Sequence, residues 1–167
     1  QAAKNEITQI YLTRPDDDLI VIDPEHEFTP LCDGLGGERV EIGESSRAHI
    51  NALDIEYEDD SEGDPIRSKC ASVLNMLGVL IGGQDGIDRM QRSLIDRTVI
   101  GMYREVREHP ELGMPTLATL HDRLAALGEP GGRDAARALE IYATGSLNAF
   151  SHATDVDTSS RFLVYDV

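Results

Sequence analysis

The sequence predicts an α/β fold in which a parallel sheet is interrupted by an all-α helical-bundle insertion. Apolar, β-prone runs lie near both ends of the chain, at Leu19–Ile22 and at Phe162–Val164. Apolar residues recur at helical spacing on both sides of the first run. They do so again from residue 66 to about 146. Because the first run has no polar interruption, it is typical of a strand covered on both faces, as in parallel sheets.

The first 45 residues predict the order helix, strand, helix, strand, an alternation typical of a doubly wound sheet. The opening QAAKNEITQIYL carries apolar residues at helical spacing, and Leu19–Ile22 is the first strand. A short helix is expected over Phe28–Leu35, ended by Gly36-Gly37. The alternating RVEI segment at 39–42 is the second predicted strand.

Four apolar stripes between residues 66 and 146 predict four amphipathic helices with short connections, a small bundle. The acidic segment 54–65 before them is expected to be a solvated loop and a subdomain boundary. After the bundle the chain returns to a strand at Arg161–Asp166. We therefore expect a partial α/β core over 1–65, a helical insertion over 66–146 and a return to the core over 147–167.

The composition excludes several functions. The chain has 167 residues, with 31 Asp and Glu against 15 Lys and Arg, a formal charge of −16. Such a chain repels phosphate backbones and anionic membranes, so direct nucleic-acid binding is not expected. Cys32 and Cys70 are too few for a disulfide framework or a zinc site, and we expect both in the core of a protein in a reducing, cytoplasmic compartment. No apolar run approaches the roughly 20 residues that span a bilayer.

A phosphate-binding loop is absent from the sequence. That loop needs GxxxxGK[ST], in which glycines expose backbone N–H groups and the lysine neutralises phosphate. Lys4 and Lys69 are the two lysines of the chain, and they follow Ala3 and Ser68. Neither lysine can belong to such a loop.

The segment Asp23-Pro24-Glu25-His26-Glu27 is the strongest candidate for chemistry. It places three carboxylates and an imidazole directly after a predicted strand, where ligands collect in open α/β sheets. A carboxylate there could orient a water molecule or hold Mg²⁺ through its water shell. The alternative, a solvated turn with no ligand, is equally consistent with the residues. No protein-held metal site is expected, because the segment lacks a spaced partner for its one histidine.

The order of several segments resembles a known family. LIVIDPEHEFTPLCDGLGG is followed by RAHINALDI, by a helical stretch, and then by ALEIYATGSLNAFSHATDVDTSSRFLVYDV. This order is similar to that of the energising ATPases of conjugative type IV secretion systems, the TraC/TrbE-like proteins or fourth VirB protein. The opening QAAKNEI resembles the helix that follows Walker A in that family. The resemblance thus implies an internal piece of a RecA-like P-loop motor of the HerA/FtsK type, with Walker A before Gln1 and Walker B beyond Val167.

The resemblance implies specific expectations for the whole protein. It would be a hexameric ATPase that uses ATP and Mg²⁺, works with other type IV secretion components, and lies in the cytoplasm at the inner face of the cell membrane. Asp23 and Glu27, with Glu25 less firmly, match strand-end acids expected near the nucleotide or its attacking water. Arg161 and Arg137 are the candidates for an arginine finger, and the role of Asn51 is unassigned. The chain alone would neither bind ATP tightly nor hydrolyse it.

A second hypothesis needs no catalysis. A self-contained acidic α/β module could use its helical part as a docking surface for another protein. A GxxxxGK[ST] motif within about ten residues upstream of Gln1 would favour the ATPase over this module.

Overall fold

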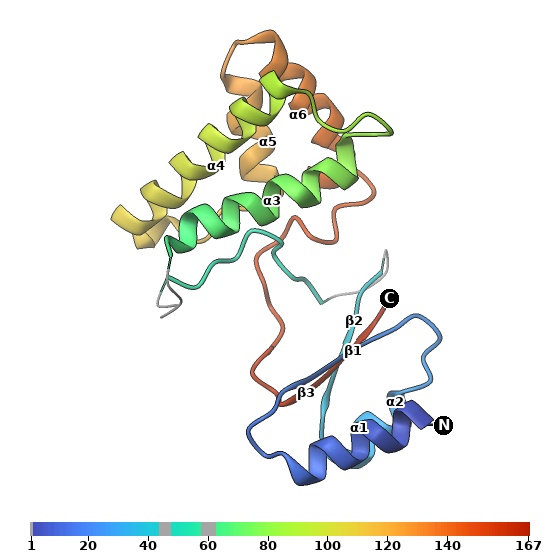
Figure 1. Ribbon diagram of the computed structural model, residues 1–167. Helices are drawn as coiled ribbons and strands as arrows, with labels where there is room; N and C mark the ends of the chain where they lie inside the picture. The colour runs from blue at the N-terminus through green and yellow to red at the C-terminus, as the bar shows by residue number, and fades with distance from the viewer. Residues whose placement is uncertain (1, 44–47, 58–62) are drawn as a thin grey trace. The chain divides into compact units, whose positions relative to one another are not determined.

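The computed structural model describes residues 2–43, 48–57 and 63–167, and it divides into two compact units (Figure 1). One unit, which we call the sheet unit, contains residues 1–49 and 155–167. The other, the helical unit, contains residues 50–154. The mixed α/β fold expected from the sequence is confirmed, because a parallel sheet and a set of helices occupy separate parts of the chain.

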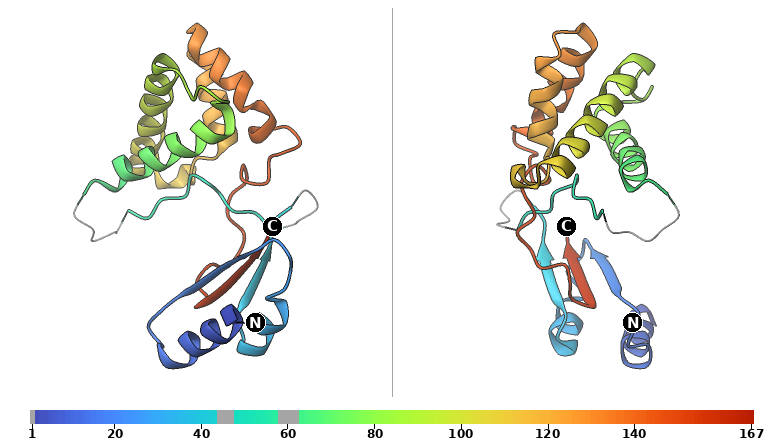
Figure 2. Two further views of the ribbon diagram at one scale, coloured as in Figure 1. Left: turned by 45° about the vertical axis from the view of Figure 1, so that its right-hand side comes forward. Right: turned by 90° about the vertical axis from the view of Figure 1, so that its left-hand side faces the viewer.

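The sheet unit contains three parallel strands and two helices. Its elements are α1 (Ala2–Thr13), β1 (Leu19–Asp23), α2 (Thr29–Leu35), β2 (Glu38–Glu41) and β3 (Phe162–Asp166). The strand order is β1-β3-β2, so the strand from the end of the chain lies between the two from its beginning (Figure 2). The element order predicted for the first 45 residues is therefore present, and β3 completes the sheet.

Two glycines allow α2 to return to the sheet. Gly36 ends the helix with φ 70°, a left-handed conformation that glycine adopts without a Cβ penalty. A Cβ on Gly37 would lie 2.8 Å from the backbone oxygen of Phe162 and 2.9 Å from Cys32 Sγ. This close approach lets β2 start directly beside β3.

One face of the sheet is covered by helices, whereas the sequence predicted two covered faces for β1. Cys32, Phe162 and Val164 form a buried cluster against which apolar residues of α1, α2 and β1 pack. On β1, Leu19 and Val21 point to that cluster, but Ile20 and Ile22 are 65% and 70% exposed. The prediction for β1 is wrong in the described chain because α1 and α2 both pack on the same face.

The helical unit has the four predicted helices and one short 3₁₀ turn. They are α3 (Pro65–Ile81), α4 (Arg89–Glu108), η1 (Pro110–Leu112), α5 (Leu117–Ala126) and α6 (Pro130–Ala143). Asp64, Asp88 and Thr116 cap α3, α4 and α5, each accepting a hydrogen bond from a backbone N–H of the first turn. The apolar stripes of the four helices meet in one core, which includes the thiol of Cys70.

The helical unit extends further at both ends than the predicted range of 66–146. Leu53 is fully buried in its core, and Tyr57 packs against that core. The Tyr103 hydroxyl donates to the Leu53 carbonyl at 2.8 Å, and the Tyr57 hydroxyl donates to the Tyr103 carbonyl at 3.1 Å. The chain before α3 therefore packs on the bundle instead of forming a solvated loop, although residues 58–62 of the predicted acidic loop lie outside the described part. None of the described helices has the length and apolar character to cross a bilayer.

Candidate functional site

The carboxyl ends of the three strands place acidic residues at one edge of the sheet. Asp23 of β1 pairs in register with Asp166 of β3, and Glu41 of β2 pairs with the same Asp166. Because all three strands are parallel, these residues share the edge at which open α/β sheets bind ligands. We call the group Asp23, Glu25, His26, Glu27, Arg39 and Asp166 the carboxyl-edge site.

Asp23 holds the turn that follows β1. Its side chain is buried, with 3% exposure, and its Oδ2 accepts a hydrogen bond from the Phe28 backbone N–H at 2.7 Å. Burial alone would raise the pKa of Asp23, but the backbone N–H groups of Phe28, Glu27 and Glu25 together hold that pKa below its ordinary value. Asp23 is therefore an ionised anchor that fixes the position of the next four residues.

The turn presents its other two carboxylates to solvent. Glu25 is exposed, and Glu27 is 60% exposed and forms an ion pair with Lys4 of α1, with Nζ 3.3 Å from Oε2. Lys4 also lies over the ring of Phe28, with Nζ 5.3 Å from the ring centroid. Glu27 is thus oriented by α1, while Glu25 has greater freedom to meet a ligand.

Asp166 is a buried acidic residue with an imidazole beside one carboxyl oxygen and a guanidinium beside the other. It is 3% exposed, with His26 Nδ1 3.5 Å from its Oδ1 and Arg39 Nη1 3.5 Å from its Oδ2. The Oδ1 atom is buried, and no hydrogen-bond partner for it lies among the described residues. His26 has φ 55°, an uncommon backbone conformation for a non-glycine residue, and this places its ring beside Asp166.

Of the residues of the carboxyl-edge site, the sequence predicted Asp23, Glu25, His26 and Glu27. It did not predict Asp166 or Arg39. The signal for Asp166 was present, because FLVYD ends in an aspartate after an apolar run just as LIVID does. Pairing the two patterns would have predicted neighbouring strands with acids in register. Arg39 carries no comparable signal, since its proximity to Asp166 follows from the pairing of β2 with β3.

The two arginine-finger candidates have different surroundings. Arg161 donates from Nη2 to the carbonyls of Tyr11 and Arg14 and from Nε to that of Asp17, and its guanidinium lies 4.5 Å from the Tyr11 ring centroid. Arg161 thus donates hydrogen bonds to carbonyl groups at and after the end of α1. To act as an arginine finger on a neighbouring subunit, it would have to break these hydrogen bonds. Arg137 is exposed on α6.

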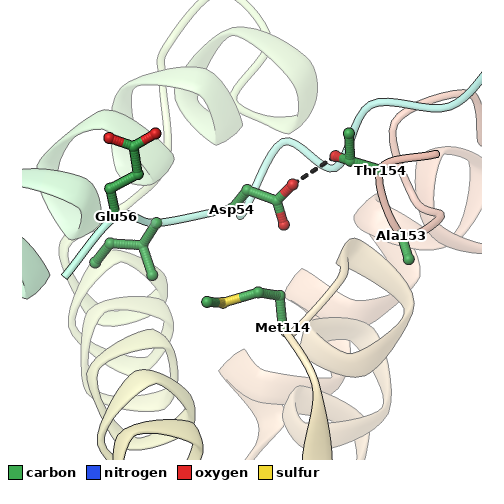
Figure 3. A pocket seen from close by; sticks show the side chains of 6 residues that line it. Asp54, Glu56, Met114, Ala153 and Thr154 are labelled. Atoms are coloured by element: carbon green, nitrogen blue, oxygen red, sulfur yellow. Dashed lines mark hydrogen bonds between the residues drawn. The ribbon is translucent and has the colours of Figure 1, made fainter. Parts of the chain in front are cut away.

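Asn51 has a structural place in the helical unit. Its Nδ2 donates to Asp54 Oδ1 at 2.7 Å and to the Pro115 carbonyl at 3.0 Å, and its Oδ1 accepts from Leu53 N–H. Thr154 donates to the second oxygen of Asp54 (Figure 3). The same Thr154 hydroxyl accepts from Asn51 N–H. Asp54 and Thr154 border an open cavity of about 650 Å³, together with Ile55, Glu56, Met114 and Ala153.

The carboxyl-edge site does not by itself fit ATP with Mg²⁺. Among the described residues no group of three or more His, Cys, Asp or Glu could hold a metal ion. The nearby lysine, Lys4, is engaged by Glu27, and no glycine-rich phosphate loop is present in the sequence. The residues can orient water and stabilise a turn, and no hydrolytic step follows from them alone.

Comparisons with known proteins bear on the fold. No protein-family model matches the sequence, and neither does any curated protein. The chain is similar to the structure of VirB4 of Thermoanaerobacter pseudethanolicus, with a TM-score of 0.78 and 20% identity over 99% of this chain. The match covers 64% of that chain, so the present sequence spans less than two thirds of its length. The likeness confirms, at the level of fold, the resemblance seen in the order of the sequence segments.

Proposed function

We propose that this chain is part of the motor domain of a type IV secretion ATPase, which uses ATP hydrolysis to power the transfer of DNA or protein. The observation that supports the proposal is a likeness to VirB4 that extends over 99% of the chain and so includes both units. The activity itself comes from the family resemblance of the sequence segments. In this proposal the phosphate-binding Walker A loop precedes Gln1, and Walker B follows Val167.

In this proposal the acidic residues of the carboxyl-edge site have different roles. Asp23 keeps the turn in place through its bonds to backbone N–H groups, and Glu25 and Glu27 orient water near the nucleotide. Mg²⁺ bound with ATP would supply charge stabilisation of the transferring phosphoryl group. Arg137 is the better candidate for an arginine finger, because Arg161 is engaged by three backbone carbonyls.

The wider setting follows from the same proposal. The whole protein would be a homohexamer in the cytoplasm, at the inner face of the cell membrane, and would act with other type IV secretion components. The charge of −16 makes this segment unsuited to grip DNA, so any transferred nucleic acid would contact other parts of the assembly.

Two measurements test the proposal. The coding sequence upstream of Gln1 should contain GxxxxGK[ST] within about ten residues, and its absence would refute the ATPase assignment. In the full-length protein, Glu27→Gln and Glu25→Gln should lower the rate of ATP hydrolysis more than the affinity for ATP. Glu38→Gln, which changes an exposed acid at the opposite end of β2, is the matched control and should leave both unchanged. Robust hydrolysis by the 167-residue chain alone would also contradict the proposal.

The non-catalytic interaction module remains the second candidate. It is favoured by an apolar cavity in the helical unit, which Met76, Leu147 and Phe150 help to line and which could receive an apolar side chain of another protein. It predicts no upstream P-loop and no ATP hydrolysis by the full-length protein.

A further inference from the structure

The carboxyl-edge site contains a buried acceptor that lacks a donor among the described residues. Asp166 is 3% exposed, and its Oδ1 atom has no hydrogen-bond partner in the part of the chain that the structure describes. Leaving a carboxylate oxygen in this state costs free energy, so a donor is expected beside it. The imidazole of His26 can supply that donor, because its Nδ1 atom lies 3.5 Å from this oxygen. Hydrogen bonds from nitrogen to oxygen are about 2.9 Å long, so a small rotation of the His26 ring completes the contact.

The backbone holds His26 at this place. Its φ of 55° is uncommon for a residue other than glycine, and such conformations concentrate at functional sites, where the surrounding structure maintains them. Asp23 maintains this one, since its Oδ2 accepts from the Phe28 N–H at 2.7 Å and closes the turn that contains His26. The position of the imidazole beside Asp166 therefore depends on the turn as well as on the side chain itself.

The carboxylate decides which ring nitrogen carries the hydrogen. In a neutral imidazole one nitrogen is a donor and the other is an acceptor. An ionised carboxylate can only accept, so a hydrogen bond between His26 and Asp166 Oδ1 requires the hydrogen on Nδ1. Nε2 is then the acceptor. The His26 side chain is 61% exposed, so this acceptor is offered to a molecule outside the turn.

The surrounding charges favour water as the partner of Nε2. Glu25 and Glu27 flank His26 in the chain, and Asp23 pairs in register with Asp166 on the neighbouring strand. A phosphate or carboxylate group would be repelled by these acids. A metal ion would need additional ligands, and the described residues contain no group of three or more His, Cys, Asp or Glu that could hold one. A water molecule meets neither obstacle.

We propose that Asp166 holds His26 as the Nδ1–H tautomer and that His26 Nε2 accepts a hydrogen bond from a water molecule at the carboxyl edge. This is the edge at which parallel sheets bind ligands. The second half of the proposal rests on the proposed function: in the ATPase the bound molecule is the attacking water, and His26 orients it. His26 is then a water-orienting residue, and Asp166 is a positioning residue that acts through it.

Nuclear magnetic resonance of the nitrogen-15-labelled 167-residue chain tests the tautomer. At a pH of about 8, where an ordinary imidazole is mostly neutral, the chemical shifts of the two ring nitrogens identify it. We expect His26 mainly as Nδ1–H in the wild type. In Asp166→Ala we expect it mainly as Nε2–H, the form that a free imidazole side chain prefers in water.

Glu111→Ala is the matched control for this measurement. It removes a carboxylate that lies 3.2 Å from His109 Nδ1 in the helical unit, and it should leave the signals of His26 unchanged. A wild type with His26 mainly as Nε2–H overturns the proposal, whether or not any variant folds. An unchanged His26 tautomer in a folded Asp166→Ala variant overturns it as well.

Kinetics of the full-length protein test the water contact. His26→Asn keeps a donor near the position of Nδ1 and tolerates a positive φ, but it has no acceptor at the position of Nε2. We expect kcat for ATP hydrolysis to fall at least about tenfold, with KM changed by less than about twofold. His26→Gln places its amide oxygen near the position of Nε2 and should restore part of the loss. His109→Asn, in the helical unit, is the control and should leave both constants unchanged.

The two measurements separate this inference from the proposed function. A full-length wild type that hydrolyses ATP, with His26→Asn equally fast, overturns the water contact and is still an ATPase. A full-length wild type without hydrolysis overturns the proposed function, and with it the role of His26 in orienting the attacking water. The spectrum of the 167-residue chain decides the pairing of His26 with Asp166 in either case.

Discussion

At the scale of single residues, Asn51 is a buried amide that joins separate parts of the helical unit. It is 3% exposed and bonds to Asp54, to Leu53 N–H and to the carbonyl of Pro115, which lies just before α5. Together, these side-chain hydrogen bonds use both the Nδ2 donor and the Oδ1 acceptor of the Asn51 amide. The segment before α3 is therefore fixed to the bundle by hydrogen bonds as well as by apolar packing.

Asn51→Ala should lower the free energy of unfolding by about 2–4 kcal/mol, because it leaves the Leu53 N–H and the Pro115 carbonyl buried without partners. Asn51→Asp should also destabilise, since a carboxylate cannot donate to Pro115 and would face the carboxylate of Asp54. Urea denaturation followed by circular dichroism measures both. Asn75→Ala, at an exposed position of α3, is the control and should change stability by under about 0.5 kcal/mol.

Asp155 gives the sheet unit a dependence on pH. Its carboxylate accepts from His49 N–H at 2.7 Å and lies 2.8 Å from His49 Nδ1, and these two bonds to His49 are the main reason that its pKa lies below the ordinary value. A carboxyl group with a lowered pKa in the folded state stabilises the fold above its unfolded pKa, and this contribution disappears as the pH falls through the lowered value. Asp155→Asn should therefore be less stable than the wild type near neutral pH. The difference should vanish in strongly acidic solution, and a difference that is constant with pH would contradict the pairing.

At the scale of elements, close backbone approach controls how α5 and α6 meet. The turn between them is short, and a Cβ on Gly132 would lie 2.8 Å from the Leu124 carbonyl oxygen and 3.3 Å from Leu127 Cβ. Both neighbours belong to the backbone or lie next to it, so they cannot move aside as the end of a long side chain could. A glycine is therefore needed in the first turn of α6.

Gly132→Ala should lower the free energy of unfolding by roughly 1–3 kcal/mol, because α6 must shift away from α5. Gly101→Ala is the matched control, since it also lies in a helix but a Cβ there meets nothing within 4 Å. That substitution should raise stability by about 0.5–1 kcal/mol through the higher helix propensity of alanine. Thermal or urea denaturation distinguishes the two, and equal effects of both changes would contradict the close approach.

Prediction from sequence succeeded where local signals decide the element. Gly36 marks the end of α2 as expected, and the four predicted apolar stripes became α3 to α6. Predictions that depended on distant partners did worse. Burial of Leu53 depends on helices that follow it, and the place of Asp166 in the carboxyl-edge site depends on pairing with β1 at the other end of the chain. The exposure of Ile20 and Ile22 depends on which face the helices cover, which periodicity within β1 cannot reveal.

At the scale of the whole molecule, the two units have separate cores of unequal size. The helical unit buries a large apolar cluster from four helices, whereas the cluster of the sheet unit has Cys32, Phe162 and Val164 as its fully buried members. Apolar burial is the main source of stability, so the two units should differ in their resistance to local opening.

Amide hydrogen exchange followed by mass spectrometry should show this difference directly. Peptides from α4 and α5 should exchange at least about tenfold more slowly than peptides from α1 and β2. Uniform protection across both units would contradict the presence of two separate cores. The excised segment 50–154 should retain the slow exchange of α4 and α5, because the cluster that protects them lies within it.

The position of β3 has a consequence for how the protein is made. β1 and β2 do not pair with each other in the sheet, and each bonds to β3, which is translated only after the entire helical unit. During vectorial synthesis on the ribosome, β1 and β2 therefore emerge before β3, the strand to which both bond in the described sheet, and they can pair with it only after residues 162–166 have been translated. The helices α3 to α6 depend on contacts within their own segment and can assemble first. The bundle is therefore expected to form first, and the sheet to close only after β3 has been translated.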